Sequence, residues 1–347
     1  MPSRDVVVIG ASAGGLQALS AIVAALPASL PACLLVVVHS SPHGGSLLPE
    51  ILQRVSALPV AFAAEGQSVR HGRVYLAAAD RPLLIDGRKL TLGRGPRENG
   101  FRPAIDPLFR TAAREFGPRV IGVVLSGGLS DGAYGLNAIK KAGGVAVVQD
   151  PQEAIIGGMP LSAMRQVDVD HVLPAADIGR IIEHLVRDAD HEGGSPMSAR
   201  ALDPDPQLTG LTDVTDMTAR FGSPSGLTCP DCGGSLWEIE DGRVVRYQCH
   251  VGHQYAADSL DAGQRDTIDN VLWAAVRVLE EHAELKGRMA RRAADRGLGA
   301  VSAVFGRSAA DAREQAERIR AIMVQPERSR RATRKPAAAR ARKRRRS

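Results

Sequence analysis

Residues 6–15 read Val6-Val7-Val8-Ile9-Gly10-Ala11-Ser12-Ala13-Gly14-Gly15, an unbroken apolar run that passes directly into a glycine-rich loop. An Ala- and Leu-rich segment of helical length follows at residues 16–25. A strand without polar alternation is typical of a parallel sheet that is buried on both faces. The stretch therefore predicts the first strand, loop and helix of an α/β domain.

Similar apolar runs recur further along the chain, with helix-length segments between them. They lie at residues 34–38, 120–125 and 145–148. This alternation predicts a doubly wound, mostly parallel sheet within residues 1–190. Residues 73–93 differ, because they read as short strands broken at Asp86-Gly87, and they predict an antiparallel hairpin.

The rest of the chain divides by composition into four segments. We expect a linker, a small zinc ribbon, a helical hairpin and a disordered basic tail at residues 191–226, 227–256, 257–326 and 327–347, respectively. Within the hairpin, apolar spacing predicts helices at 264–295 and about 308–324, separated by Gly297-Leu298-Gly299.

Composition excludes several classes of protein. The 347 residues are 44% hydrophobic, which is enough for more than one core. The sequence contains no run of 18 apolar residues, so a membrane-spanning helix is not expected. The start lacks the regions of a signal peptide, and four cysteines are too few for a disulfide framework in a chain of this length. We therefore expect a cytoplasmic protein.

The positive net charge of +6 comes from the end of the chain. Residues 328–347 hold 11 Lys and Arg and no acidic residue. Such a run is expected to bind polyanions non-specifically or to contact an anionic membrane surface. Only 3% of residues are aromatic, so base stacking is not expected.

The glycine-rich loop has several interpretations. A dinucleotide-binding loop needs a glycine where Ser12 stands, and a P-loop needs a Gly-Lys-Ser/Thr sequence that is absent here. Gly10-x-Ser12-x-Gly14 matches a nucleophile elbow, in which the turn exposes the serine hydroxyl near a helix N-terminus. A turn without chemistry is the alternative.

Two further polar residues follow apolar strands. His39 comes directly after residues 34–38, and Asp131 follows the strand at 120–125 and precedes a helix. The carboxyl ends of parallel strands are where open α/β sheets place their sites, so Ser12, His39 and Asp131 form a candidate triad of nucleophile, base and orienting acid. Alternatively, His39 is a satisfied polar residue and Asp131 is a helix N-cap.

These motifs, together with Arg102-Pro103-Ala104-Ile105-Asp106 and Gly158-Met159-Pro160, resemble the catalytic domain of the chemotaxis methylesterase CheB over about residues 4–187. The resemblance implies a protein-glutamate methylesterase, a carboxylic ester hydrolase that acts on methylated chemoreceptors and in some members deamidates glutamines. It implies the roles given above for Ser12, His39 and Asp131, with no cofactor for catalysis. Oxyanion and substrate-binding groups are then expected at Ala13, Gly128, Leu129 and Arg102, although Arg102 is equally readable as half of a salt bridge.

Three cysteines and two histidines cluster in the predicted ribbon. Cys229 and Cys232 form a CxxC knuckle, and Cys249 is followed by His250 and His253. This spacing is typical of a tetrahedral structural zinc site, with Cys229, Cys232, Cys249 and His253 as ligands. His253 is favoured over His250 because a three-residue gap lets it converge with Cys249. Free core cysteines are the alternative.

Two functions from different classes follow. The leading hypothesis is the methylesterase. The alternative is a non-catalytic regulatory or binding module of a signalling pathway, in which Ala13 and Gly128 replace residues common in chemotaxis members of the family.

Overall fold

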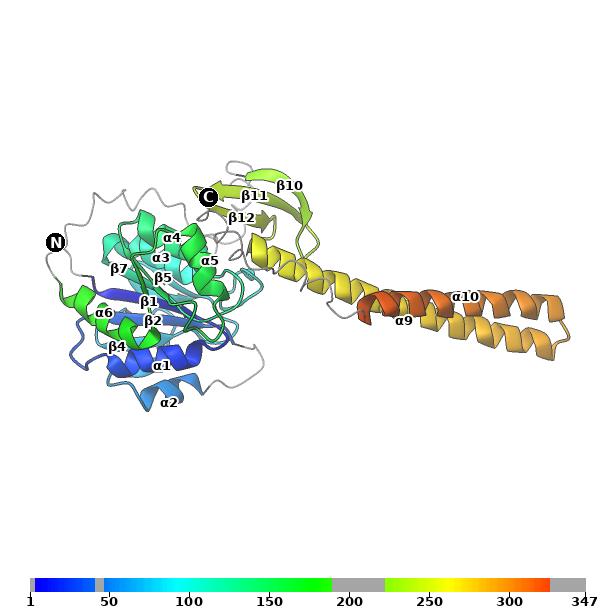
Figure 1. Cartoon of the computed structure of the whole chain (residues 1–347), viewed down its shortest axis with the longest axis horizontal. Helices are drawn as coiled ribbons and strands as arrows, with labels where there is room; N and C mark the ends of the chain where they lie inside the picture. The colour runs from blue at the N-terminus through cyan, green and yellow to red at the C-terminus, as the bar shows by residue number, and fades with distance from the viewer. Residues whose placement is uncertain (1–3, 41–46, 189–221, 325–347) are drawn as a thin grey trace, which may run out of the picture. The chain divides into compact units, whose positions relative to one another are not determined.

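The computed structural model describes residues 4–40, 47–188 and 222–324, and the chain separates into two compact units after Gly263. The first unit contains a seven-stranded sheet in the order β3-β4-β2-β1-β7-β8-β9, with every neighbouring pair parallel (Figure 1). Its strands are β1 (Val6–Ala11), β2 (Cys33–Val38), β3 (Val60–Phe62), β4 (Arg73–Leu76), β7 (Val120–Val124), β8 (Val145–Gln149) and β9 (His171–Leu173).

Helices cover both faces of this sheet. One face carries α1 (Gly15–Ala25), α2 (Leu48–Gln53) and α6 (Ala175–Arg187), and the other carries α3 (Ile105–Phe116), α4 (Ala133–Lys141) and α5 (Gly158–Gln166), with a 3-10 turn at Gly117–Arg119. Alternate residues of β1 enter different cores, because Val6 and Val8 face α3 and α4 while Val7 and Ile9 face α1 and α6. The predicted doubly wound fold is confirmed.

The predicted antiparallel hairpin is β5 (Leu83–Asp86) with β6 (Lys89–Leu92), a separate two-stranded sheet. Gly87 and Arg88 both have positive φ, of 53° and 66°, as a tight two-residue hairpin turn requires. β4 lies in the same predicted segment but joins the parallel sheet, because it pairs with β2 and β3 and buries Val74 and Leu76.

A second, antiparallel sheet follows, and we call it the ribbon sheet (residues 222–256). It consists of β10 (Gly222–Thr228), β11 (Ser235–Asp241), β12 (Val244–Cys249) and β13 (Gln254–Ala256), paired in that order. The sheet starts at Gly222, inside the predicted linker of residues 191–226. Residues 191–221 of that linker and the tail of residues 327–347 lie outside the described residues.

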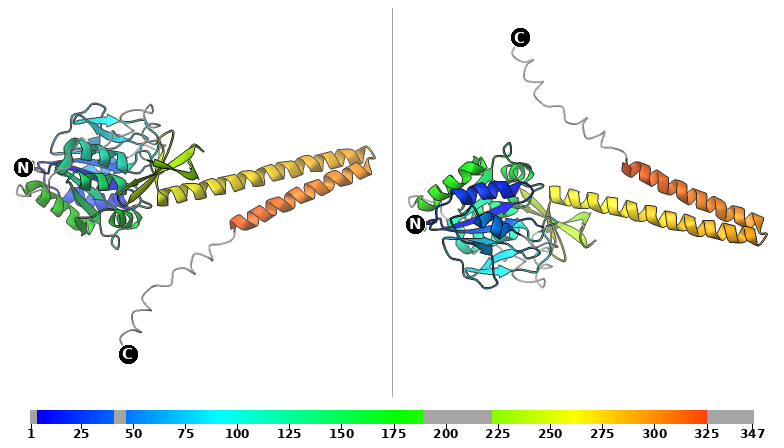
Figure 2. Two further views of the ribbon diagram at one scale, coloured as in Figure 1. Left: turned by 90° about the horizontal axis from the view of Figure 1, so that it is seen from above. Right: turned by 90° about the horizontal axis from the view of Figure 1, so that it is seen from below.

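The helical hairpin consists of α9 (Ala257–Asp295) and α10 (Gly299–Val324), which lie side by side (Figure 2). Ser302 donates to the carbonyl of Ala290, and Arg320 pairs with Glu280. Residues 296–298 separate the two helices and overlap the predicted break at 297–299. Helix α10 starts at Gly299 instead of near 308, because the Ala- and Val-rich start continues the helix. Among the described residues, no helix is long and apolar enough to span a membrane.

Candidate active site

The three predicted triad residues meet at the carboxyl edge of the parallel sheet. Ser12 follows β1, His39 follows β2, and Asp131 lies in the loop after β7. Because β1 lies between β2 and β7, the three loops converge where the strand order reverses, the usual site position in such sheets. His39 Nδ1 lies 3.0 Å from Ser12 Oγ, and its Nε2 lies 2.7 Å from Asp131 Oδ2.

The histidine ring is held in one orientation. Its side chain is only 4% exposed, and the Phe101 ring stacks on it with centroids 3.7 Å apart and planes within 12°. When the Nε2–H donates to Asp131, the lone pair of Nδ1 faces the Ser12 hydroxyl and can accept its proton. In the serine protease template the two ring nitrogens have the opposite partners.

The Asp131 carboxylate is fully buried but well satisfied. Besides His39, it accepts hydrogen bonds from the backbone N–H groups of Ile105 (2.7 Å) and Gly132 (3.0 Å) and from Asn99 Nδ2 (3.0 Å). Burial acts to raise the pKa of Asp131, but the hydrogen bond and positive charge that His39 can supply, with the other donors, hold it below its ordinary value. Asp131 is therefore ionised at neutral pH.

A second buried carboxyl group, Asp106, lies beside Asp131. It accepts hydrogen bonds from the N–H of Gly135 (2.7 Å) and from Asn99 Nδ2 (3.0 Å). Burial, and then the negative charge of Asp131, raise the pKa of Asp106 well above its ordinary value. The negative charge of this pair is therefore held by Asp131, the member that contacts His39.

The turn that carries Ser12 is fixed by its neighbours. The Ser12 N–H donates to Ser126 O (2.9 Å), and the Ser126 hydroxyl donates to Ala13 O (2.9 Å). Gly14 adopts a left-handed φ of 77°, which ends the elbow and starts α1. At Gly127 a Cβ atom would collide with the Met159 sulfur and lie 2.7 Å from Ser12 Cβ, so only glycine lets this loop approach the nucleophile.

The predicted oxyanion residues lie around the same turn. Ala13 is exposed, while Gly128 and Leu129 are half-buried, and Leu129 has a positive φ of 62°. Within the described part of the chain, the N–H groups of these three residues make no hydrogen bond. The rest of the described chain therefore leaves these three N–H donors unused. Arg102 instead donates to Asp80 (2.7 Å) and to the carbonyl of Gly95 (3.3 Å), the salt-bridge alternative considered from the sequence.

The ribbon sheet brings the four predicted metal ligands together. One potential ligand atom from each of Cys229, Cys232, Cys249 and His253 lies within 4.8 Å of the others. Cys232 Sγ is 3.7 Å from Cys249 Sγ, which is 3.4 Å from His253 Nδ1. Hydrogen bonds to the Cys229 thiolate, of which the one from Cys249 has the greatest effect, lower the pKa of Cys229 to about 3. The cluster is compatible with a metal ion and does not include His250.

Comparison with known proteins accounts for the first part of the chain. The family model described as CheB methylesterase matches residues 7–182, which contain all three triad residues. The chain belongs to the CheB methylesterase family. The crystal structure of the Thermotoga maritima CheB methylesterase catalytic domain superposes with a TM-score of 0.51 at 34% identity, covering 53% of this chain and all of that one.

Curated relatives carry the name protein-glutamate methylesterase/protein-glutamine glutaminase. Those from Methanosarcina mazei and Pyrococcus abyssi are 39% and 40% identical over 192 and 191 residues, covering 53% and 54% of this chain but 52% and 51% of their own. The chain thus spans about half the length of these relatives. A Leptospira interrogans relative, 38% identical over 182 residues, is matched over 94% of its length. The ribbon sheet lies beyond the CheB family match.

Three residues around the triad were not predicted from the sequence. Asn99 and Phe101 lie in an irregular loop that carries no motif, and Asp106 belongs to a family motif that assigns it no role of its own. Their roles depend on contacts with Asp131 and His39, which are distant in sequence, so no local pattern marks them.

Proposed function

We propose that this chain is a serine esterase that removes methyl groups from glutamate side chains of chemoreceptor-type signalling proteins. The observation that carries the proposal is the hydrogen-bonded series Ser12–His39–Asp131 inside the segment that matches the CheB family. The names of the relatives support the same substrate class. Because such substrates present their methylated helices in the cytoplasm, that location is part of the proposal.

The reaction follows from the geometry. His39 Nδ1 takes the proton from the Ser12 hydroxyl as its oxygen attacks the ester carbonyl carbon. The N–H groups of Ala13, Gly128 and Leu129 are the proposed donors to the developing oxyanion. His39 then returns the proton to the departing methoxy oxygen, which leaves as methanol, and Asp131 stabilises the imidazolium in between. Water, activated by His39, releases the glutamate carboxylate and regenerates Ser12.

The same site has the groups needed to deamidate glutamine. The attack and the oxyanion are the same, and the proton from His39 goes to the departing nitrogen, which leaves as ammonia. We propose Arg102 as a contact for acidic residues that flank the substrate glutamate, reached at the exposed side of its pair with Asp80.

Release of methanol from methylated receptor preparations tests the esterase. Ser12→Ala should reduce turnover on the order of 10⁶-fold, because triad members act as a unit. Ser20→Ala, on helix α1, is the matched control and should retain turnover. A folded wild-type protein that neither releases methanol nor reacts at Ser12 with a fluorophosphonate would favour the non-catalytic signalling module.

For the ribbon sheet we propose a structural zinc ion held by Cys229, Cys232, Cys249 and His253. Tetrahedral zinc with Zn–S bonds of about 2.3 Å separates two thiolates by about 3.8 Å, close to the 3.7 Å between Cys232 and Cys249. Metal analysis of protein purified without chelator should find one zinc per chain. Cys232→Ser should lower that content, and His250→Ala should not. A wild-type protein without zinc would contradict this assignment.

We propose that the basic residues of 328–347 bind polyanions through charge alone. The intact protein should bind duplex DNA of any sequence, with an affinity that falls steeply with salt, and a protein ending at Pro326 should not. Selective binding to vesicles of anionic lipid would instead assign the tail to a membrane surface. Equal binding by the intact and shortened proteins would remove the tail from both roles.

A further inference from the structure

The ribbon sheet is attached to the loop that surrounds the triad. Strand β13 runs along residues 97–99, which belong to the loop before α3. Asn99 N–H donates to the carbonyl of Gln254 (2.7 Å), and Gln254 N–H donates to the carbonyl of Arg97 (3.4 Å). Two residues after Gln254, the N–H of Ala256 donates to the side-chain oxygen of Asn99 (2.8 Å). Two backbone bonds and one side-chain bond therefore fix this loop against β13.

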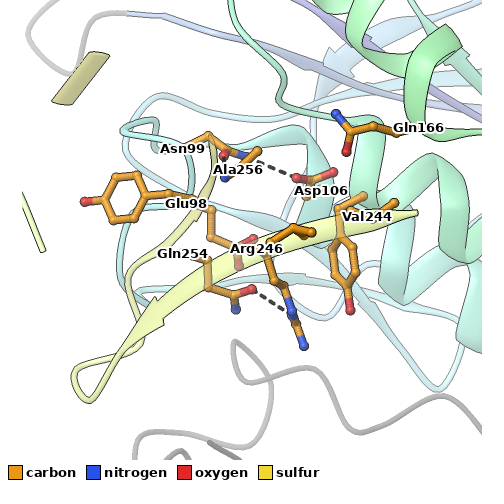
Figure 3. A pocket seen from close by; sticks show the side chains of 11 residues that line it. Glu98, Asn99, Asp106, Gln166, Val244, Arg246, Gln254 and Ala256 are labelled. Atoms are coloured by element: carbon orange, nitrogen blue, oxygen red, sulfur yellow. Dashed lines mark hydrogen bonds between the residues drawn. The ribbon is translucent and has the colours of Figure 1, made fainter. Parts of the chain in front are cut away.

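The Asn99 side chain passes this contact on to the triad. Its oxygen accepts from Ala256, so its amide nitrogen faces the opposite way, where it donates to Asp106 Oδ2 (Figure 3) and to Asp131 Oδ1, both at 3.0 Å. Asn99 is 5% exposed, so water does not replace these partners. If the Asn99 amide were turned over, its oxygen would face the two carboxyl groups and its NH₂ group would face the N–H of Ala256, so all three hydrogen bonds would be lost.

The same loop also orients His39. Phe101, two residues after Asn99, supplies the ring that stacks on the imidazole. Glu98 and Phe101 exchange two backbone hydrogen bonds, of 3.2 and 2.9 Å, which join the segment that touches β13 to the segment that touches His39. A second contact lies beside the triad acid, where Ser130 Oγ is 3.2 Å from Ser259 Oγ at the start of α9.

We propose that Asn99 is a positioning residue for Asp131, and that the metal-bound ribbon sheet, through Ala256, is an activating element of the esterase. The inference rests on the proposed function and on the proposed metal site. No group of the ribbon sheet takes part in the bond changes. Its effect is to hold the carboxylate and the imidazole in the geometry that the reaction requires.

Metal binding reaches β13 by a short path. His253, a proposed ligand, directly precedes Gln254, and its carbonyl accepts from the N–H of Cys249, another ligand. The hydrophobic cluster that surrounds the proposed ligands is small, and it consists of Cys229, Leu236, Cys249 and Tyr255 with Leu260 of α9. A cluster of this size contributes little stability by itself, so we expect the position of Ala256 to depend on the ion.

Three variants of the full chain test the hydrogen-bond relay. Asn99→Ala should lower kcat about 10- to 100-fold with little change in KM, because it removes a donor to a buried carboxylate that does not touch substrate. Ala256→Pro removes the N–H that anchors Asn99, at a strand position where an extended backbone accepts proline, and should lower kcat about 3- to 10-fold. Ala257→Pro is the matched control: it removes the next N–H, at the first position of α9 where proline is tolerated, and should keep wild-type kcat.

Removal of the metal tests the coupling. Chelation of the full chain should lower kcat at least as much as Ala256→Pro does, because it also releases the two backbone bonds between Gln254 and residues 97–99. Chelation of the Ala256→Pro protein should lower kcat by a smaller factor than chelation of the wild type, because the two changes share the bond from Ala256 to Asn99. Independently of turnover, hydrogen exchange of the Asn99 backbone amide should become faster on chelation and in Ala256→Pro, but not in Ala257→Pro. Restoring zinc should reverse the change in the wild type.

The outcomes separate this inference from the proposed function. If wild-type protein hydrolyses the ester, and Asn99→Ala, Ala256→Pro and the chelated wild type all keep wild-type kcat, the relay is wrong and the esterase stands. A wild type that shows no hydrolysis overturns the proposed function itself. If Asn99→Ala does not fold, Ala256→Pro and chelation still decide the question. A kcat loss on chelation of the Ala256→Pro protein equal to that of the wild type would show that the metal acts by another route.

Discussion

Replacing Asp131 with asparagine tests how the imidazole is kept in its reactive tautomer. The change keeps the shape of the side chain but turns one oxygen into an NH₂ group. The oxygen with fewer donors is Oδ2, which accepts only from His39 Nε2 and from the N–H of Ile105, whereas Oδ1 accepts from Asn99 and from backbone N–H groups. We therefore expect the NH₂ group to occupy the Oδ2 position.

Two separate consequences follow from that placement. The NH₂ group donates to His39 Nε2, so the ring proton moves to Nδ1. A protonated Nδ1 can no longer accept the proton of the Ser12 hydroxyl. By analogy with serine protease triads, the loss is about 10⁴-fold in kcat, or about 5.4 kcal/mol of barrier at 1.36 kcal/mol per decade. The N–H of Ile105 loses its acceptor, which costs about 1–3 kcal/mol in the free energy of unfolding.

Methanol release and urea denaturation measure the two effects in the same protein. The expected result is a folded variant, destabilised by this modest amount, whose kcat is near 10⁻⁴ of wild type with KM little changed. A variant that is folded and retains more than a tenth of the wild-type kcat would show that Asp131 does not set the tautomer of His39.

Two further changes test the neighbours of the triad. Asp106→Asn should become more stable than the wild type as pH increases above about 4, because buried Asp106 with its raised pKa keeps a proton in the folded protein and loses it in the unfolded one. The difference between the two unfolding free energies, measured by urea titration, should grow by up to about 1.4 kcal/mol per pH unit until the folded pKa of Asp106 is passed. A difference that does not change with pH would contradict a protonated Asp106. Gly127→Ala should lower kcat on the order of 10²-fold by displacing Ser12, whereas Gly306→Ala, where the added Cβ meets no atom within 4 Å, should keep it; crystallographic placement of an unmoved Ser12 in an active Gly127→Ala variant would refute the steric argument.

The parallel sheet could be predicted because its signal is local. Unbroken runs such as residues 6–9 and 34–38 have to be buried on both faces, and that requirement leaves few arrangements for strands that alternate with helices. The same rule put Ser12 and His39 at one edge of the sheet, since each directly follows a strand. The Asp86-Gly87 signal of the hairpin, whose turn residues are Gly87 and Arg88, and the CxxC knuckle of Cys229 and Cys232 are likewise short-range patterns.

What lay beyond prediction depends on contacts between residues far apart in the chain. The ring nitrogen of His39 that faces Ser12 is decided by Asp131, 92 residues away, and by the ring of Phe101. Asn99 has no motif, yet its amide joins Asp131 to Ala256, which is 157 residues further along. Hydrogen bonds of this kind select a side-chain orientation only after both elements have packed, so the amino-acid pattern around Asn99 carries no trace of them. Composition and spacing determined the fold and the members of the candidate triad, and tertiary packing decided how the triad is held.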